Sequence, residues 1–179
     1  MPNLDDRIGI RGDLRIAVID AKTGQVLRRI DIRNKIMFQA ADLLVSLLAQ
    51  RAVDYPGGLP GQIPNDQIYT IRMGTGSTAP LRTDTNLVNP VFGFHLDDAH
   101  KVTAMPGELQ FLATMGTSDG NGNSYQEAGL FTKGATSGVL DLPGSTVLTP
   151  RMFARQVHPA IPKTNAISLQ YSWTIAFTA

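Results

Sequence analysis

Apolar and polar residues alternate with a period of two along much of the chain, and this pattern predicts β-strands. The clearest run is the stretch 163–179, in which apolar side chains (Ile167, Leu169, Tyr171, Trp173, Ile175 and Phe177) alternate with small or polar ones (Ser168, Gln170, Ser172, Thr174, Ala176 and Thr178). Successive side chains of a strand point to opposite faces. We therefore expect the apolar face to be covered by the chain's own core and the small, uncharged face to contact another subunit.

Shorter alternating runs predict further strands at 14–20, 26–32, 68–73, 91–96, 101–104, 109–115, 125–132, 139–142 and 147–157. The first two flank a turn at 21–24 that ends in a glycine, which predicts a β-hairpin. The runs 109–115 and 125–132 flank the turn cluster at 119–123 and predict a second hairpin. Pro159 and Pro162 are expected to break the chain ahead of the terminal strand.

The pattern changes to a helical period after Asn34, whose side chain suits a helix N-cap. From Lys35 to Arg51, apolar residues recur at spacings of three and four and form one stripe: Ile36, Ala40, Leu43, Leu44, Leu47 and Leu48. A Pro- and Gly-rich stretch at 55–61 ends the helix. We expect this amphipathic helix to pack on a sheet face or against another subunit.

Together these elements predict a mainly β protein, an antiparallel β-sandwich of jelly-roll type with one helix near residues 35–51. We expect a single domain over 1–179 with long loops at 55–67 and 74–90. No strand–helix–strand alternation appears, which argues against a parallel α/β sheet.

The composition limits the classes of partner that we expect for this chain. With 42% hydrophobic and 17% charged residues, the chain has the composition of an ordinary globular protein. Its net charge of +1 gives no strong positive field that would attract nucleic acid. It contains no cysteine, which excludes thiolate zinc sites, disulfides and cysteine nucleophiles. It shows neither an apolar run of about 18 residues nor a basic, apolar leader. We expect a protein that folds in a reducing cytoplasm and binds neither nucleic acid nor membrane.

Two loops resemble ligand-binding motifs in part. Residues 74–79, GTGSTA, match the dinucleotide pattern G-x-G-x-x-A, but Pro80 falls where the phosphate-binding helix would have to begin. Residues 119–123, DGNGN, carry oxygen ligands at alternate positions as a calcium loop does, but Ser124 and Leu130 stand where that loop needs Gly and Glu. We predict a connecting arm and a turn, respectively.

The histidines give no catalytic or metal site. His95 and His100 are five residues apart and do not share a strand face, and His158 is distant in sequence. No serine lies in a nucleophile-elbow context. The sequence therefore predicts no catalytic residue, no metal ligand, no cofactor and no small-molecule substrate.

Three groups of segments carry a family resemblance. They are Ile71-Arg72-Met73-Gly74-Thr75-Gly76 with Pro80 and Asp84-Thr85-Asn86-Leu87; Glu127-Ala128-Gly129-Leu130-Phe131; and Met152-Phe153-Ala154-Arg155 with Lys163-Thr164 and the aromatic terminal strand. In this order the chain resembles a group of small virion structural proteins of tailed bacteriophages, found around the tail, neck and baseplate. The resemblance implies a β-sandwich subunit that is assembled in several copies in the host cytoplasm and is located in the virion.

We therefore expect a non-enzymatic structural component of a phage tail, collar (neck) or baseplate, which forms a symmetric ring or trimer and joins other virion proteins. The expected subunit interface comprises apolar residues of the loops and the small face of the terminal strand: Tyr55, Leu59, Ile63, Leu81, Leu87, Ser168, Gln170, Ser172 and Thr174. One alternative is a receptor- or carbohydrate-binding module of a phage appendage that uses Asn121, Asn123 and Tyr125. Another is a capsid decoration protein. A hydrolase lacks a recognisable nucleophile or carboxylate pair.

Overall fold

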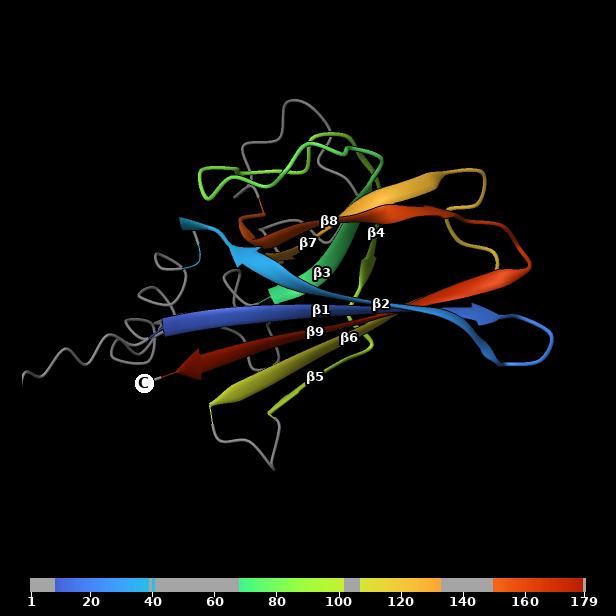
Figure 1. Cartoon of the computed structure of the whole chain (residues 1–179), viewed down its shortest axis with the longest axis horizontal. Helices are drawn as coiled ribbons and strands as arrows, with labels where there is room; N and C mark the ends of the chain where they lie inside the picture. Colours follow the sequence, from blue (N-terminus) through green and yellow to red (C-terminus); the bar gives the residue numbers. More distant parts are fainter. Residues whose placement is uncertain (1–8, 39, 41–67, 102–106, 133–149, 179) are drawn as a thin grey trace, which may run out of the picture.

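A computed structural model describes residues 9–38, 40, 68–101, 107–132 and 150–178. In these ranges the chain forms nine strands: β1 (Gly9–Asp20), β2 (Val26–Ile36), β3 (Ile68–Gly74), β4 (Pro90–His95), β5 (Asp98–Lys101), β6 (Glu108–Met115), β7 (Ser124–Thr132), β8 (Met152–Pro162) and β9 (Ile167–Thr178). They are hydrogen-bonded in the order β4-β3-β7-β8-β2-β1-β9-β6-β5, and each strand is antiparallel to its neighbours (Figure 1).

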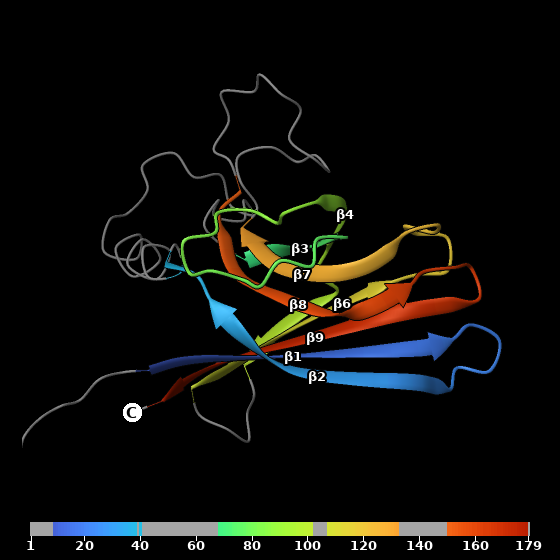
Figure 2. The same ribbon diagram turned by 45° about the horizontal axis from the view of Figure 1, so that its top comes forward.

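The nine strands form two antiparallel sheets that share β2. Sheet A contains β2, β1, β9, β6 and β5, and sheet B contains β8, β7, β3 and β4 with the end of β2. Residues Val26–Asn34 of β2 pair with β1, whereas Lys35 and Ile36 pair with β8. In Figure 2, β3, β7 and β8 lie above β1, β2 and β9. The expected mainly β, antiparallel class is confirmed.

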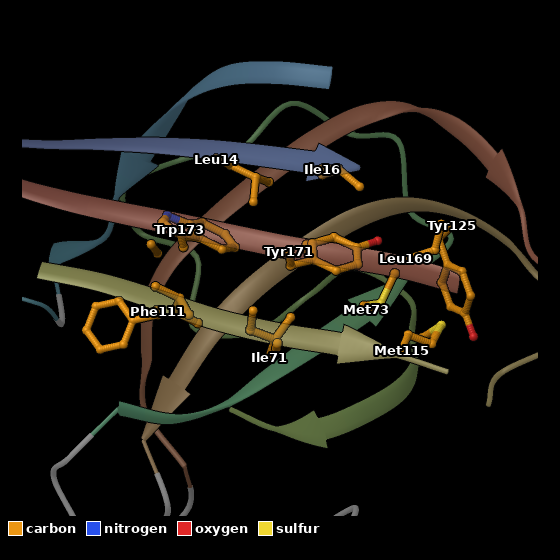
Figure 3. Packing of buried hydrophobic residues seen from close by; sticks show 14 of the residues in the cluster. Leu14, Ile16, Ile71, Met73, Phe111, Met115, Tyr125, Leu169, Tyr171 and Trp173 are labelled. Carbon is orange, nitrogen blue, oxygen red and sulfur yellow. The ribbon is translucent and has the colours of Figure 1, made fainter. Parts of the chain in front are cut away.

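One apolar core contains side chains from both sheets (Figure 3). Leu169, Tyr171 and Trp173 of β9 are fully buried in it, as are Ile71 and Met73 of β3. β9 pairs with β1 over twelve residue pairs and with β6 over eight, so it is an interior strand of sheet A. The alternation of the terminal strand thus predicted its buried face correctly.

The β1–β2 hairpin is confirmed. Gly24 has a φ of 68°, which closes the turn without steric cost. The Asp20 carboxylate accepts the backbone N–H groups of Lys22 and Thr23, at 2.9 and 2.7 Å. The hydrogen bonds from Thr23, first through its backbone and then through its hydroxyl, lower the pKa of Asp20.

The predicted helix is not seen among the residues that the structure describes. Asn34, Lys35 and Ile36 belong to β2 rather than to an N-cap and first turn. They remain extended because β2 continues past the end of its pairing with β1 in order to join β8. Phe38 and Ala40 have helical backbone, and residue 39, the rest of the expected helix (41–51) and the loop at 55–67 lie outside the described residues.

The second predicted hairpin is wrong. β6 pairs with β5 and β9 in sheet A, and β7 pairs with β3 and β8 in sheet B, so residues 116–123 cross from one sheet to the other. A period of two shows that two segments are strands but not which strands they pair with. The expected partner strand at 101–104 begins earlier, as β5 at Asp98–Lys101, and residues 102–106 and 133–149 lie outside the described ranges.

Pro159 does not break the chain, because β8 runs on to Pro162. Tyr125 of β7 pairs with Ile161 and Glu127 pairs with Val157, so three residues of β8 stand opposite one of β7 at this point. Such a bulge leaves backbone groups out of the ladder, and a proline is tolerated there.

Candidate functional site

A buried ion network lies on the face of sheet B that points away from the shared core. Arg155 of β8 is fully buried, and its Nη2 donates to Oε2 of the equally buried Glu127 of β7 at 2.8 Å. Its Nε donates to the same oxygen at 3.0 Å. Its Nη1 donates to Oδ2 of Asp84 at 2.8 Å, and Nη2 also donates to the carbonyl of Thr78 at 2.9 Å. One guanidinium thus contacts two carboxylates and a backbone carbonyl.

Glu127 holds the segment between β3 and β4, residues 75–89, which we call the arm. Its Oε1 accepts the backbone N–H groups of Gly76 at 3.2 Å and Asn89 at 2.8 Å, and its Oε2 accepts that of Val88 at 3.1 Å. Both ends of the arm are therefore tied to one carboxylate. Because Asp84 and Thr78 bind Arg155 as well, the ion network fixes the arm at its ends and along its length.

Gly74 and Gly76, the two glycines of the G-T-G stretch, have no Cβ atom that would collide with the Glu127 carboxylate. A Cβ added at Gly76 would lie 2.5 Å from Oε1 of Glu127, and one at Gly74 would lie at the same distance from that oxygen. Gly74 also packs against the carbonyl of Asn89, which a Cβ would approach to 2.3 Å. The close approach of a side chain, rather than of a phosphate, explains why these positions carry glycine, and the prediction of a connecting arm agrees with this geometry.

Leu87 anchors the arm on its apolar side. It is 5% exposed and belongs to a small second cluster with Met37, Phe131 and Met152. A Cβ on Gly129 would lie 3.1 Å from a Leu87 methyl group, so this glycine makes room for the leucine. We expected Leu87 at a subunit interface, but contacts inside its own chain account for its apolar character.

The loop 116–123 is stabilised by a lysine. Lys163 is 1% exposed, and its Nζ donates to Oδ1 of Asn121 at 2.9 Å and to the carbonyl of Thr164 at 3.0 Å. Burial lowers the pKa of Lys163, and the nearby charge of Asp119 opposes this effect. The ammonium group therefore binds one of the side-chain oxygens that a calcium ion would need, that of Asn121. Among the described residues, no group of three His, Asp or Glu side chains is arranged to hold a metal.

The residues considered for carbohydrate binding make their hydrogen bonds within this same loop. The amide nitrogen of Asn121 donates to the carbonyl of Thr117 at 2.8 Å, and that of Asn123 donates to the carbonyl of Gly120 at 3.2 Å. Tyr125 is fully buried, and its hydroxyl donates to the carbonyl of Gly120 at 2.9 Å. These hydrogen bonds give all three side chains a structural role within the loop.

The histidines are not brought together. His95 packs against Tyr69 with ring centroids 4.5 Å apart, whereas His158 is 3% exposed and lies 6.5 Å from the Tyr171 ring. Burial lowers the pKa of His158, and the hydrogen bond between its Nδ1 and the carbonyl of Pro159 partly opposes this. This histidine is part of the packing between the sheets.

The other expected interface residues fall into two groups. Leu81 lies on the arm and is 59% exposed, and Tyr55, Leu59 and Ile63 lie outside the described residues. The expected small face of the terminal strand lies on the outside of sheet A, where all four members are at least partly exposed: Ser168, Gln170, Ser172 and Thr174. The structure places Leu81 and this face on different parts of the molecule, on the arm over sheet B and on sheet A.

The ion network was not predicted from the sequence, although its charged residues lie in the three groups of segments that carry the resemblance. The available signal was a charged residue within a largely apolar strand, Glu127 in YQEAGLF and Arg155 in MFARQV. A buried charge is rare unless it is paired, so a Glu and an Arg in two apolar strands indicate a pair.

Comparison of the chain with protein-family models, with curated proteins and with solved structures finds no match in any of the three. Among the described residues, no helix has the length and apolar character needed to cross a membrane.

Proposed function

We propose that this chain is a non-enzymatic structural subunit of a tailed-bacteriophage virion, a β-sandwich of the tail, collar or baseplate that assembles with copies of itself and joins other virion proteins. The support is the resemblance carried by the three groups of segments. Their most distinctive residues, Gly74, Gly76, Asp84, Glu127 and Arg155, meet in one ion network. The motifs that carry the resemblance thus have one structural role in this chain, which is to fix the arm.

The observation that carries the proposal is a fixed arm with exposed apolar side chains. Leu81 and Val88 are 59% and 56% exposed, although the ion network holds the backbone on both sides of them. Phe38, also 59% exposed, is tied to the arm by its N–H, which donates to the carbonyl of Arg82 at 3.0 Å. A preorganised loop loses little conformational entropy on binding, so apolar groups on it favour docking. We infer that a neighbouring virion subunit covers these groups.

The test is assembly of the purified protein with and without its particle proteins, followed by native mass spectrometry. Leu81→Asp and Val88→Asp are expected to abolish the association, while each variant keeps the fold of the wild type. Leu27→Asp is the matched control, because Leu27 is equally exposed (59%) but lies on the β1–β2 hairpin. A chain that stays monomeric alone and with its particle proteins would count against the proposal, and glycan binding by the isolated chain would favour a receptor-binding module.

A further inference from the structure

The outer face of sheet A, the side that points away from the core, carries an ordered pattern of charge. Its strands β2, β1, β9 and β6 form a shallow hollow of about 530 Å³. The hollow is lined mainly by charged and polar side chains: Arg11, Asp13, Arg15, Asp31, Arg33, Glu108, Gln110, Ser172 and Thr174. The proposed function does not say what this face binds or in which orientation.

The strand register places these side chains in two rows that cross the sheet. In the first row, Asp13 stands between Arg33 of β2 and Thr174 of β9. In the second row, Arg15 stands between Asp31 and Ser172. The sign of the charge therefore alternates both along β1 and across the β1–β2 pair, whereas the β9 half of each row is neutral and small.

We propose that this face binds a second copy of the chain about a two-fold axis that crosses the strands at right angles, midway between the two rows. Half a turn about that axis exchanges the rows. Asp13 then faces Arg15 of the second copy, Arg33 faces Asp31 of the second copy, and Thr174 faces Ser172 of the second copy. Every charge of the two rows meets an opposite charge, as a self-complementary two-fold interface requires.

The charge pattern disfavours a two-fold axis that runs parallel to the strands between β1 and β9. That axis would lay the charged β2–β1 half of one copy on the β9–β6 half of the other, whose one charged lining residue is Glu108, and would leave desolvated charges without partners. A parallel axis between β1 and β2 would instead place Asp13 opposite Arg33 and Arg15 opposite Asp31 of the second copy, and the mixing experiment below distinguishes it, because there Asp13→Arg and Arg15→Asp would not restore each other's contacts.

Beyond the two rows, the proposed axis would place Arg11 on β1 opposite the small Ala17, so no like-charge pair arises along this strand. The corresponding partner of Arg29 on β2 is Lys35, and the Nζ of Lys35 is turned to the arm, where it donates to the carbonyl of Pro80 at 2.9 Å.

Shape and size agree with such a contact. A twisted sheet is a saddle, and a saddle turned by half a turn about an axis across its strands fits its own surface. Four strands of up to twelve residues present roughly 40 Å by 19 Å, on the order of 750 Å², and a standard interface buries about 800 Å² on each partner. The hollow gives room for the guanidinium groups of the second copy.

The charged groups are already oriented in the single chain. Nε of Arg15 donates to Oδ1 of Asp31 at 2.6 Å, and Nε of Arg11 lies 2.9 Å from Oδ2 of Asp13. The side chains of the Arg15–Asp31 pair remain 65% and 61% exposed, so each has donor or acceptor capacity left for a second copy. An exposed pair contributes little by itself, and shielding from water between two copies would strengthen it.

The test exchanges charges and then mixes the variants. The Asp13→Arg variant carries arginine at both 13 and 15, and the Arg15→Asp variant carries aspartate at both positions. Because position 13 faces position 15 of the second copy, each variant's homodimer brings like charges together twice. We expect each variant alone to weaken dimerisation by roughly a hundredfold or more. A mixture of the two restores opposite charges at both contacts, so native mass spectrometry should show the mixed dimer and little of either homodimer.

Controls separate assembly from folding. Lys22→Asp, in the exposed hairpin turn, should leave the dimer unchanged. Thermal unfolding of each variant shows whether it is folded, and Arg33→Asp mixed with Asp31→Arg provides a second pair that tests the same axis. The mixed-dimer signal cannot come from a defect in folding, because a variant that fails to fold is not rescued by another variant.

This inference rests on the proposed function only in taking the chain to be an assembling subunit, and the results distinguish the two. A wild-type monomer at high concentration, homodimers unaffected by charge reversal, or a glycan or peptide bound at this face would each overturn the two-fold contact. If the variants assemble normally but Leu81→Asp does not, the contact is wrong and the structural function stands. If the two-fold dimer forms but no particle protein ever binds, the contact stands and the virion function is wrong.

Discussion

Replacement of Glu127 by Gln should destabilise the protein more than any other single change that keeps the side chain's shape. Glu127 is fully buried and contacts both Arg155 and three backbone N–H groups of the arm, those of Gly76, Val88 and Asn89. The amide lacks the negative charge that offsets the buried guanidinium, and its NH₂ group is a donor where Glu127 presents an acceptor. At least one of the donors at Gly76, Val88, Asn89 or Arg155 then meets another donor.

The magnitude follows from the burial of the pair. Breaking a buried ion pair by neutralising one partner costs about 3–5 kcal/mol. Asp84, which stays hydrogen-bonded to Arg155 and is 23% exposed, compensates part of the lost charge and places the expected value near the lower end. For a chain of this length, about 3 kcal/mol corresponds to a fall in melting temperature of roughly 6–12 °C. Glu127→Gln should also expose the arm, whose amides at Gly76, Val88 and Asn89 should exchange faster with deuterium.

The assay is urea unfolding followed by circular dichroism at fixed protein concentration, for the wild type, Glu127→Gln, Arg155→Met and the double variant. The double variant should lose less free energy of unfolding than the sum of the two single variants, because removing both charges leaves no unpaired buried charge between this pair. Glu108→Gln, on the outer face of sheet A, serves as the control and should change the free energy of unfolding by less than about 0.5 kcal/mol. A Glu127→Gln variant as stable as this control would refute the reasoning about the ion network.

Three further predictions concern packing and protonation. Gly76→Ala should destabilise by about 2 kcal/mol or more, because its Cβ would lie 2.5 Å from Oε1 of Glu127; Gly93→Ala, whose Cβ would have no neighbour closer than 3.4 Å, should be tolerated when both are compared by thermal unfolding. Tyr171→Phe should be neutral or stabilising by up to about 1 kcal/mol in urea unfolding, because the buried hydroxyl has no hydrogen-bond partner among the described residues; a clear loss of stability would show that the hydroxyl is paired. The folded pKa of His158 lies below the 6.5 of an exposed histidine, so the unfolded chain binds a proton that the folded chain excludes. Stability should therefore fall by up to about 1.4 kcal/mol per pH unit as the pH drops below 6.5, and this part of the pH profile should vanish in His158→Gln.

The sequence predicted local structure well wherever one face of a strand is buried. The alternation of Leu169, Tyr171 and Trp173 with polar neighbours identified β9 and its inner face, and Gly24 identified the first hairpin. Pairing was harder to predict. β6 and β7 are adjacent in sequence with a glycine-rich turn between them, yet they belong to different sheets, because the turn spans the core instead of closing a ladder.

The arm shows why the candidate site was only partly predictable. Its glycines, its Asp and the distant Glu127 and Arg155 were all visible in the sequence, but the contact joins residues 28 to 77 positions apart. The periodicity of apolar and polar residues within one segment carries no information about contacts over such a sequence separation. The apolar Leu81 and Leu87 looked equivalent in sequence, and only the fold shows that one is 59% exposed while the other fills a cluster beside Gly129.

The place of β9 between β1 and β6 has a consequence for the time at which the outer face of sheet A is complete. β1 is made early and β9 late, yet they are neighbours over twelve residue pairs. While the ribosome is still making residues 167–178, β1 and β6 have no partner between them, and the rows that contain Ser172 and Thr174 do not exist. Contacts between segments so far apart in sequence form slowly. A truncated or nascent chain therefore cannot present the finished outer face of sheet A, so the two-fold contact proposed for that face could form only between chains translated through β9.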